Sequence, residues 1–223
     1  MRYLLVLALG LATSSVASAA ERTLTVYTYD SFVSEWGPGP GIEAAFEARC
    51  GDCDLRFVAL DGGVDILQRL RLEGEGSGAD LVLGLDMNLM AEARQLDLLA
   101  PHRVDTAPLA LPIDWNDDTF LPYDWGHFAF VYDSEQLEEP PGSFRELLEA
   151  PEEVQLILQD PRTSVTGQGL LLWIKHVYGD QAPAVWAQLN ERVLTVTSSW
   201  SQAYFSLFMN GEAPMVLSYA TSP

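Results

Sequence analysis

Between residues 24 and 96, short apolar runs alternate with segments whose apolar residues recur at helical spacing. The strand-like runs are residues 24–29, 55–60 and 79–85, and the helix-like segments are residues 42–49, 64–73 and 87–96. Continuous apolar runs of this length are typical of buried strands, and a spacing of three to four residues is typical of an amphipathic helix. Successive strand–helix units predict an α/β fold with an open, mostly parallel sheet and right-handed crossovers.

A second α/β unit follows a break in this pattern. Residues 97–123 contain four prolines and no period, which is typical of a loop-rich boundary. Beyond it we expect strands at residues 128–132, 154–158, 193–197 and 214–219, and helices at residues 143–150, 169–178, 182–192 and 200–209. The chain is therefore predicted to form a first lobe over residues 20–108 and a second over residues 109–217.

The first 19 residues have the pattern of a cleavable signal peptide. Arg2 precedes a short apolar run, and Ala17-Ser18-Ala19 is a small-residue cleavage motif. The run is too short to span a bilayer, and no cysteine stands at the cleavage site to carry a lipid anchor. A buried N-terminal helix is the alternative. The complete pattern favours a soluble protein exported to the periplasm, without direct membrane insertion.

The charge balance excludes some partners. Lys and Arg number 12 against 32 Asp and Glu, for a formal net charge of -20. Such a surface repels nucleic acid and anionic lipid and attracts cations. A general adaptation of the surface for solubility or salt explains the same charge, so its sign alone names no ligand.

The chain has two cysteines, Cys50 and Cys53, in a Cys-Gly-Asp-Cys motif. A thioredoxin-like redox centre would place the first cysteine at a helix N-terminus, where its thiol pKa falls. Here the pair follows a predicted helix and precedes a strand. We therefore predict a local structural disulfide, as an oxidising compartment allows.

Acidic and aromatic residues gather where predicted strands end. Asp30, Asp61 and Asp86 each lie at or just after such an end, which is the edge where open α/β sheets bind ligands. Each is also a plausible helix N-cap. Trp36 and Trp200 stand in polar turns, and aromatic rings beside carboxylates suit a flat or cationic ligand.

Several blocks of the sequence resemble the periplasmic thiamine-binding proteins, the solute receptors of bacterial thiamine ABC importers. The blocks are residues 24–40 (with LTVYTYDSF and WGPGP), 80–89, 159–164, 169–173 and 217–223. The resemblance covers essentially all of the chain after the predicted signal peptide, in one order. It implies the type II periplasmic-binding-protein fold, in which two α/β lobes close on the ligand. It also implies a receptor without catalysis or cofactor that carries thiamine or thiamine phosphate to a membrane permease.

The resemblance further implies a ligand site in the cleft between the lobes. The implied contacts are Tyr29, Asp61, Gly62, Gly63, Ser164, Val165, Trp200, Ser218, Tyr219, Ala220 and Thr221. The turn after the second strand departs from the family pattern, because Gly62-Gly63 stands where an Asp-Gly pair is expected. Asp61, one position earlier, is the candidate replacement for the acidic contact. The loop at Ser164 would suit a hydroxyl or phosphate group.

Family members continue beyond the position of Pro223. The resemblance therefore implies that residues 218–223 start a return crossing to the first lobe and that the last part of this lobe is missing. The strand near residues 80–85 would then keep one side partly exposed. Two alternatives remain. A receptor of the same fold for iron or a polyamine would differ in its ligand set. A secreted serine hydrolase using Ser164 or Ser218 would need a Ser-His-acid arrangement, which the sequence does not display.

Overall fold

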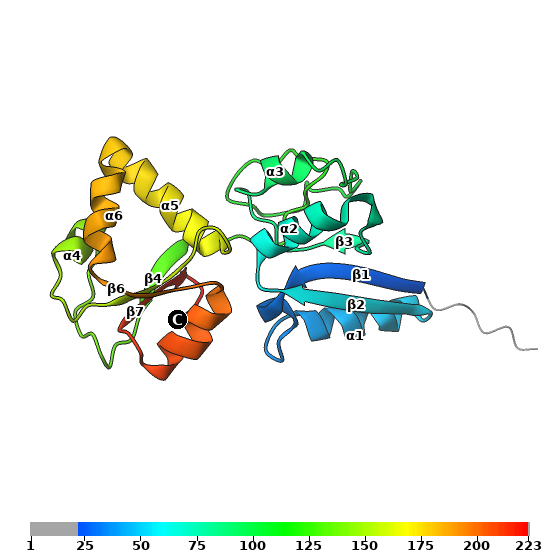
Figure 1. Ribbon diagram of the computed structural model, residues 1–223. Helices are drawn as coiled ribbons and strands as arrows, with labels where there is room; N and C mark the ends of the chain where they lie inside the picture. The colour runs from blue at the N-terminus through cyan, green and yellow to red at the C-terminus, as the bar shows by residue number, and fades with distance from the viewer. Residues whose placement is uncertain (1–21, 223) are drawn as a thin grey trace, which may run out of the picture.

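The computed structural model describes residues 22–222 and contains two α/β lobes, shown side by side in Figure 1. The predicted signal peptide, residues 1–19, lies outside the described residues. Each lobe has its own sheet, one of three strands and one of four. None of the helices in the described part of the chain is long and apolar enough to cross a membrane.

The first lobe is built on a parallel sheet with the strand order β2-β1-β3. Its strands are β1 (Arg22–Tyr29), β2 (Cys53–Leu60) and β3 (Leu81–Val82), and its helices are η1 (Asp30–Val33), α1 (Gly39–Cys50), α2 (Gly63–Glu73), η2 (Gly74–Gly76) and α3 (Met90–Arg94). β1 and β2 pair over their whole length, from Arg22 opposite Cys53 to Tyr29 opposite Leu60. The sheet therefore ends in one row, at which the chain turns into η1 and α2.

The helix α2 is more deeply buried than α1. Its residues Ile66, Leu67 and Leu70 are at most 3% exposed. Ile66 and Leu70 pack with the buried ring of Tyr27, and Leu67 packs with Leu89. In α1 only Gly39 is buried, and Ile42 is 42% exposed. The helix thus covers its side of the sheet incompletely.

The second lobe has a mixed sheet with the strand order β4-β7-β5-β6, in which only β4 runs antiparallel to its neighbour. Its strands are β4 (Phe128–Tyr132), β5 (Leu156–Gln159), β6 (Val193–Thr197) and β7 (Met215–Tyr219). Its helices are α4 (Phe144–Glu149), α5 (Val165–Tyr178), η3 (Gly179–Gln181), α6 (Ala182–Asn190), the π-helix η4 (Gln202–Leu207) and the 3-10 helix η5 (Phe208–Asn210). Ser143 caps α4 by accepting a hydrogen bond from the Glu146 N–H, as its sequence predicts.

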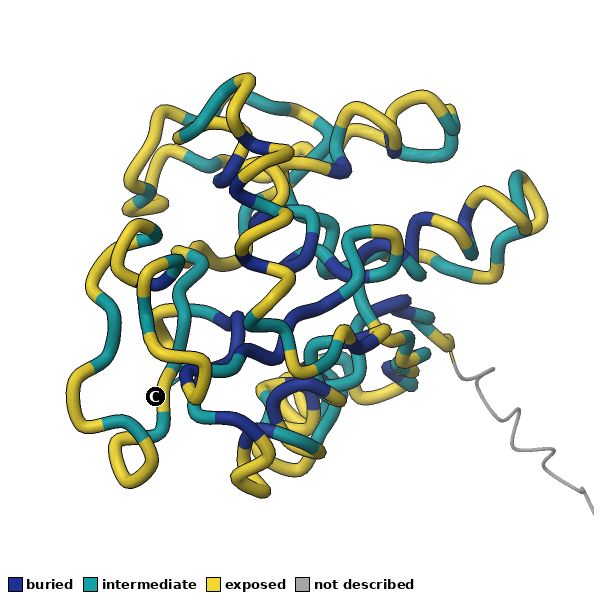
Figure 2. The backbone as a smooth tube through the Cα atoms, turned by 60° about the vertical axis from the view of Figure 1, so that its left-hand side comes forward, coloured by how far each residue is buried: buried dark blue, intermediate teal, exposed yellow. Residues whose placement is uncertain are grey.

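Both faces of this second sheet are covered, and its buried residues are concentrated in β5 and β7. Figure 2 shows buried stretches in the interior of the molecule and exposed stretches in the outer loops. Leu156, Leu158 and Leu217 face α5 and α6, whereas Ile157 and Val216 face η4. Because alternate residues of a strand point to opposite faces, a strand buried on both sides is apolar throughout. β5 has all four residues buried.

Most predicted elements are confirmed, with four corrections. The helix predicted at residues 87–96 is only Met90–Arg94. The strand predicted at residues 79–85 is only Leu81–Val82, because the chain leaves the sheet at Gly84, whose φ is +111°. Leu81 is 47% exposed. The helix predicted from residue 169 begins at Val165, since Gly167 and Gly169 lie within it. The helix predicted at residues 200–209 is in large part a π-helix followed by a 3-10 turn.

Candidate functional site

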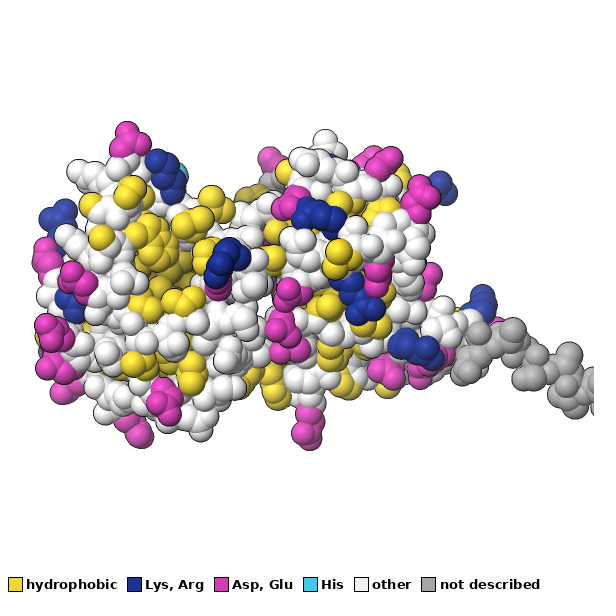
Figure 3. Space-filling model, in the orientation of Figure 1, with side chains coloured by type: hydrophobic (Ala, Val, Ile, Leu, Met, Phe, Trp, Pro, Cys, Tyr) yellow, Lys and Arg dark blue, Asp and Glu magenta, His cyan; other side chains and the backbone are white. Residues whose placement is uncertain are grey.

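The carboxyl ends of the parallel strands in the two lobes lie on the sides that face each other. In Figure 1 the tips of β1 and β2 point toward the second lobe. Tyr29 is the last residue of β1, and Tyr219 is the last residue of β7. This edge is where open α/β sheets bind ligands. In the space-filling view the outline of the molecule narrows between the lobes (Figure 3).

Two tyrosine rings and two carboxylates gather at these strand ends. Burial raises the pKa of the Tyr29 phenol, and the hydrogen-bonded hydroxyl of Tyr123, 3.4 Å away, raises it further. Burial also raises the pKa of the Tyr219 phenol, with added contributions from the Asp86 and Asp124 carboxylates. Asp124 acts in the same direction on Tyr29. The four side chains are therefore close enough to share one electrostatic environment.

The two carboxylates have no cationic partner within residues 22–222. Desolvation raises the pKa of both Asp86 and Asp124, because a partly dehydrated carboxylate is disfavoured. Asp86 is partly stabilised by hydrogen bonds from Asn88 and the Leu89 N–H, so it also organises the turn before α3. The site thus holds negative charge beside aromatic rings, an arrangement that favours a cation.

Trp200 is half-buried rather than exposed in a polar turn, which corrects the sequence-based premise. Its Nε1–H donates to the Ser218 Oγ at 2.8 Å, and its ring stacks on Tyr204 with centroids 5.1 Å apart. Phe205 contacts it edge-on at 5.4 Å, and Tyr219 lies 6.3 Å away. Trp200 therefore lies in an aromatic cluster of the second lobe that reaches the end of β7.

The two candidate serines have their hydroxyls turned inward. Ser164 is 4% exposed and bonds Thr166 at 2.8 Å, and Thr166 in turn donates to the Gln159 Oε1 at 2.7 Å. Ser218 is fully buried and accepts from Trp200. In the described part of the chain neither hydroxyl has a histidine partner. Both hydroxyls therefore make hydrogen bonds within the second lobe.

The turn at residues 61–63 has an exposed acidic residue at its start and a buried glycine at its end. Asp61 is exposed at the end of β2, and its charge raises the pKa of nearby Asp65, on which burial has the larger effect. Gly63 is buried, and an added Cβ there would lie 2.5 Å from the Gly84 carbonyl oxygen and 3.2 Å from the Val165 Cγ1. Gly63 and Val165 are thus brought together from different lobes.

The remaining candidates, Ala220 and Thr221, are exposed in the turn after β7. The Ala220 N–H donates to the His127 carbonyl oxygen at 2.9 Å, so the turn after β7 lies beside the segment that leads into β4. Sequence reasoning missed Tyr123 and Asp124, because they stand in the proline-interrupted segment without a period. Their signal was local: an aromatic residue next to an acid just before a strand.

The local disulfide prediction is confirmed, because Cys50 and Cys53 are bonded. With Asp52 they form the group of possible metal-ligating atoms found among the described residues. The thiols are oxidised, and Asp52 pairs with Arg22 at 2.6 Å. Since metal-binding cysteines must be thiolates, this group does not suit a metal ion.

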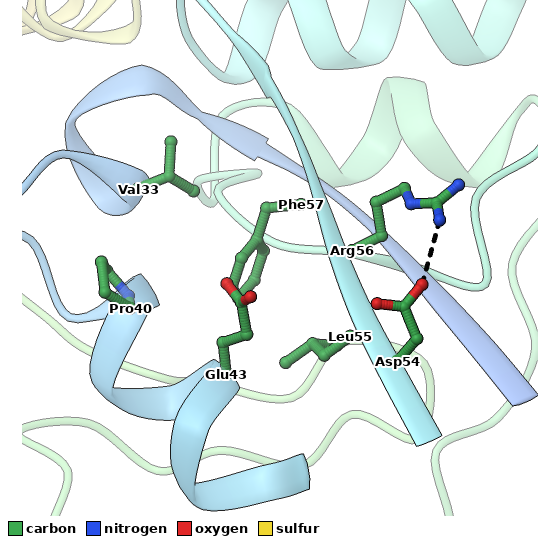
Figure 4. A pocket seen from close by; sticks show the side chains of 7 residues that line it. All are labelled: Val33, Pro40, Glu43, Asp54, Leu55, Arg56 and Phe57. Atoms are coloured by element: carbon green, nitrogen blue, oxygen red, sulfur yellow. Dashed lines mark hydrogen bonds and ion pairs between the residues drawn. The ribbon is translucent and has the colours of Figure 1, made fainter. Parts of the chain in front are cut away.

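Two shallow cavities lie away from the facing strand ends. The first, about 350 Å³, lies between α1 and β2 and is lined by Val33, Pro40, Glu43, Asp54, Leu55, Arg56 and Phe57 (Figure 4). The second, about 590 Å³, lies between α4 and α6 on the outside of the second lobe. The first exists because α1 covers the sheet incompletely, and neither contains a residue of the aromatic and acidic site.

The fold is that of a two-lobed α/β protein in which the carboxyl ends of the parallel strands face each other between the lobes. The chain belongs to the bacterial extracellular solute-binding protein family, whose model matches residues 36–223. Its architecture is that of the type II periplasmic binding proteins, since solved structures of that class share it.

Among its relatives is the thiamine-binding periplasmic protein of Brucella suis biovar 1, which is 56% identical over 93% of this chain and 61% of that protein. The protein of the same name from Escherichia coli is 53% identical over 92% of this chain and 62% of that protein. A solved structure named periplasmic thiamin binding protein superposes with a TM-score of 0.88 at 52% identity, covering 92% of this chain and 64% of the other. The chain thus spans less than two thirds of the length of these relatives.

Proposed function

We propose that this protein is a periplasmic receptor that binds thiamine or a thiamine phosphate and delivers it to the membrane permease of an ABC importer, without catalysing a reaction. The names of its relatives at 53–56% identity support both the ligand class and the compartment. The observation that carries the proposal is that Asp86 and Asp124, two carboxylates without an ion-pair partner among residues 22–222, lie near the phenols of Tyr29 and Tyr219.

The chemistry of thiamine matches this arrangement. Its thiazolium ring is flat and permanently positive, so it gains both from stacking on aromatic rings and from carboxylates that lack another partner. A cation over an aromatic face gains about 0.5–2 kcal/mol, with the larger values in desolvated sites. The raised pKa of Asp86 and Asp124 shows how their desolvation disfavours negative charge, which a bound cation would offset.

The ferric alternative has less support. An iron site would favour paired tyrosines with histidine or carboxylate ligands, and Tyr219 has no adjacent tyrosine, because Ala220 follows it. The names of the relatives at 53–56% identity also favour an organic cation.

Equilibrium titration with thiamine, followed by tryptophan fluorescence, tests the proposal. A neutral analogue with carbon in place of the thiazolium nitrogen, a polyamine and Fe³⁺ serve as competitors. We expect thiamine to bind with the highest affinity and the neutral analogue to bind more weakly. Equal affinities for thiamine and its neutral analogue would refute the role of the carboxylates. Hydrolysis of an ester or phosphate substrate would refute the receptor proposal.

A pair of variants isolates the charge. Asp124→Asn should weaken thiamine binding roughly fivefold to tenfold, about 1 to 1.4 kcal/mol, while leaving the neutral analogue unaffected. Asp114→Asn makes the same change of charge at an exposed position of the same segment and should leave both affinities unchanged. An equal loss for both variants would mean that only the overall charge of the protein matters.

A further inference from the structure

The π-helix η4 makes side-chain contacts from the second lobe to the first. Ser201, directly before it, donates a hydrogen bond from its Oγ to the Asp30 Oδ1 at 2.9 Å. Phe205, inside it, packs on Trp36 with ring centroids 5.0 Å apart. Asp30 follows β1, and Trp36 lies in the turn before α1, so both partners belong to the first lobe.

The geometry of the π-helix sends neighbouring side chains in different directions. Tyr204 stacks on Trp200 within the second lobe, whereas Phe205 reaches Trp36 in the first. Asn210 donates from its side-chain amide to the carbonyl oxygens of Phe205 and Ser206, at 3.2 and 3.0 Å. These bonds occupy carbonyls near the end of the π-helix. Turns of this type occur frequently at functional sites.

The first-lobe partner is held in place before the contact forms. The Asp30 Oδ1 also accepts the Ser31 N–H at 2.6 Å, which fixes the carboxylate at the start of η1. The aromatic pair is different, because Trp36 is 62% exposed and Phe205 is 38% exposed. Because the two rings come from different lobes, each covers part of the other's apolar surface only while the lobes stay together.

We propose that Asp30, Ser201, Trp36 and Phe205 form a latch that holds the two lobes together without ligand. The latch also contacts the aromatic cluster, because Phe205 packs edge-on against Trp200. Separating the lobes would therefore remove one support of Trp200. The effect on ligand release rests on the proposed receptor function, whereas the effect on lobe separation does not.

The latch predicts a specific relation between closure and affinity. The apparent dissociation constant equals the intrinsic constant divided by the fraction of molecules in the binding-competent state. Breaking the latch lowers that fraction and leaves Tyr29, Tyr219, Asp86 and Asp124 unsubstituted. The expected result is a faster release of ligand, with the ligand preference unchanged.

The test uses the whole chain with spin labels on cysteines introduced at Leu72 and Leu172, exposed positions on α2 and α5. The native cysteines are disulfide-bonded and do not react. We compare wild type, the Ser201→Ala/Phe205→Leu variant and the control Ser206→Ala, which changes an exposed serine of the same π-helix. Without ligand, the distances between the two spin labels should be longer in the double variant than in the other two proteins.

Identical distributions for all three proteins would overturn the latch. Circular dichroism and thermal unfolding establish that the double variant is folded, and the single variant Ser201→Ala replaces it if it is not. In stopped-flow dissociation the double variant should release thiamine roughly threefold to tenfold faster than the control. If wild type binds no thiamine, the proposed function fails, while the distance measurement still decides the latch.

Discussion

Gly63→Ala should destabilise the first lobe, although glycine at the start of a helix is usually dispensable. A Cβ at this position would lie 2.5 Å from the Gly84 carbonyl oxygen, 3.1 Å from the Leu89 Cδ1 and 3.2 Å from the Val165 Cγ1. The first of these is backbone, and Gly84 is held at a φ of +111°. The backbone at residue 63, where α2 begins, must therefore move away from the Gly84 carbonyl to make room for the added methyl group.

The magnitude follows from two opposing terms. Overpacking a core position costs about 1–3 kcal/mol. Replacing glycine by alanine returns about 0.4–1 kcal/mol through the lower entropy of the unfolded chain. The net loss should be about 1–2 kcal/mol, which for a chain of this size lowers the melting temperature by roughly 2–8 °C.

Gly62→Ala provides the matched control. No atom lies within 4 Å of the Cβ that it would add, and its φ of 174° is ordinary extended backbone. Its melting temperature should equal that of wild type or exceed it slightly. Thermal and urea unfolding followed by far-ultraviolet circular dichroism compare the three proteins. If Gly63→Ala and Gly62→Ala have the same melting temperature and urea midpoint, the close approach of residue 63 to the Gly84 carbonyl does not limit stability.

Three further outcomes are expected. Ser218→Ala should cost about 1–2 kcal/mol, because it leaves the indole N–H of Trp200 without its partner; urea unfolding measures it, and an unchanged midpoint would contradict it. Hydrogen bonds from the neighbouring arginine lower the pKa of Asp160 to about 2, below the ordinary 3.8, so its stabilising contribution is present above pH 3.8 and lost as the pH falls toward 2. As the pH falls from 3.8 to 2, the free energy of unfolding should therefore decrease more in wild type than in Asp160→Asn, and urea unfolding at several pH values measures it. Replacing Cys50 and Cys53 by serine should cost at most about 2 kcal/mol, because the closed loop is short, and should leave thiamine affinity unchanged in a titration.

The periodic elements of the fold could be predicted from the sequence because their burial is regular. The strand at Phe128–Tyr132 and the helix capped by Ser143 were predicted from local pattern and capping chemistry. The early end of the third strand could not be predicted, because it depends on the positive φ of Gly84. A glycine in the sequence permits such a φ but does not require it. The π-helix could not be predicted, since its apolar spacing resembles that of an ordinary helix.

The candidate site divides in the same way. Residues at strand ends, such as Tyr29 and Tyr219, could be placed from the order of elements alone. The direction of a hydroxyl could not, and Ser164 turns inward to a polar network that no spacing predicts. Tyr123 and Asp124 come from an aperiodic segment, and only the tertiary structure brings them beside β1.

The position of β7 has a consequence for how the second lobe is made. It is the last of the described strands in sequence, yet it lies between β4 and β5. Among the described strands β4 pairs with β7 alone, so Phe128 has no strand partner until Tyr219 is in place. The two strands are far apart in sequence, and pairing of distant segments is slow because the loop between them must close first. Formation of this sheet therefore depends on a long-range contact rather than on pairing of neighbouring strands.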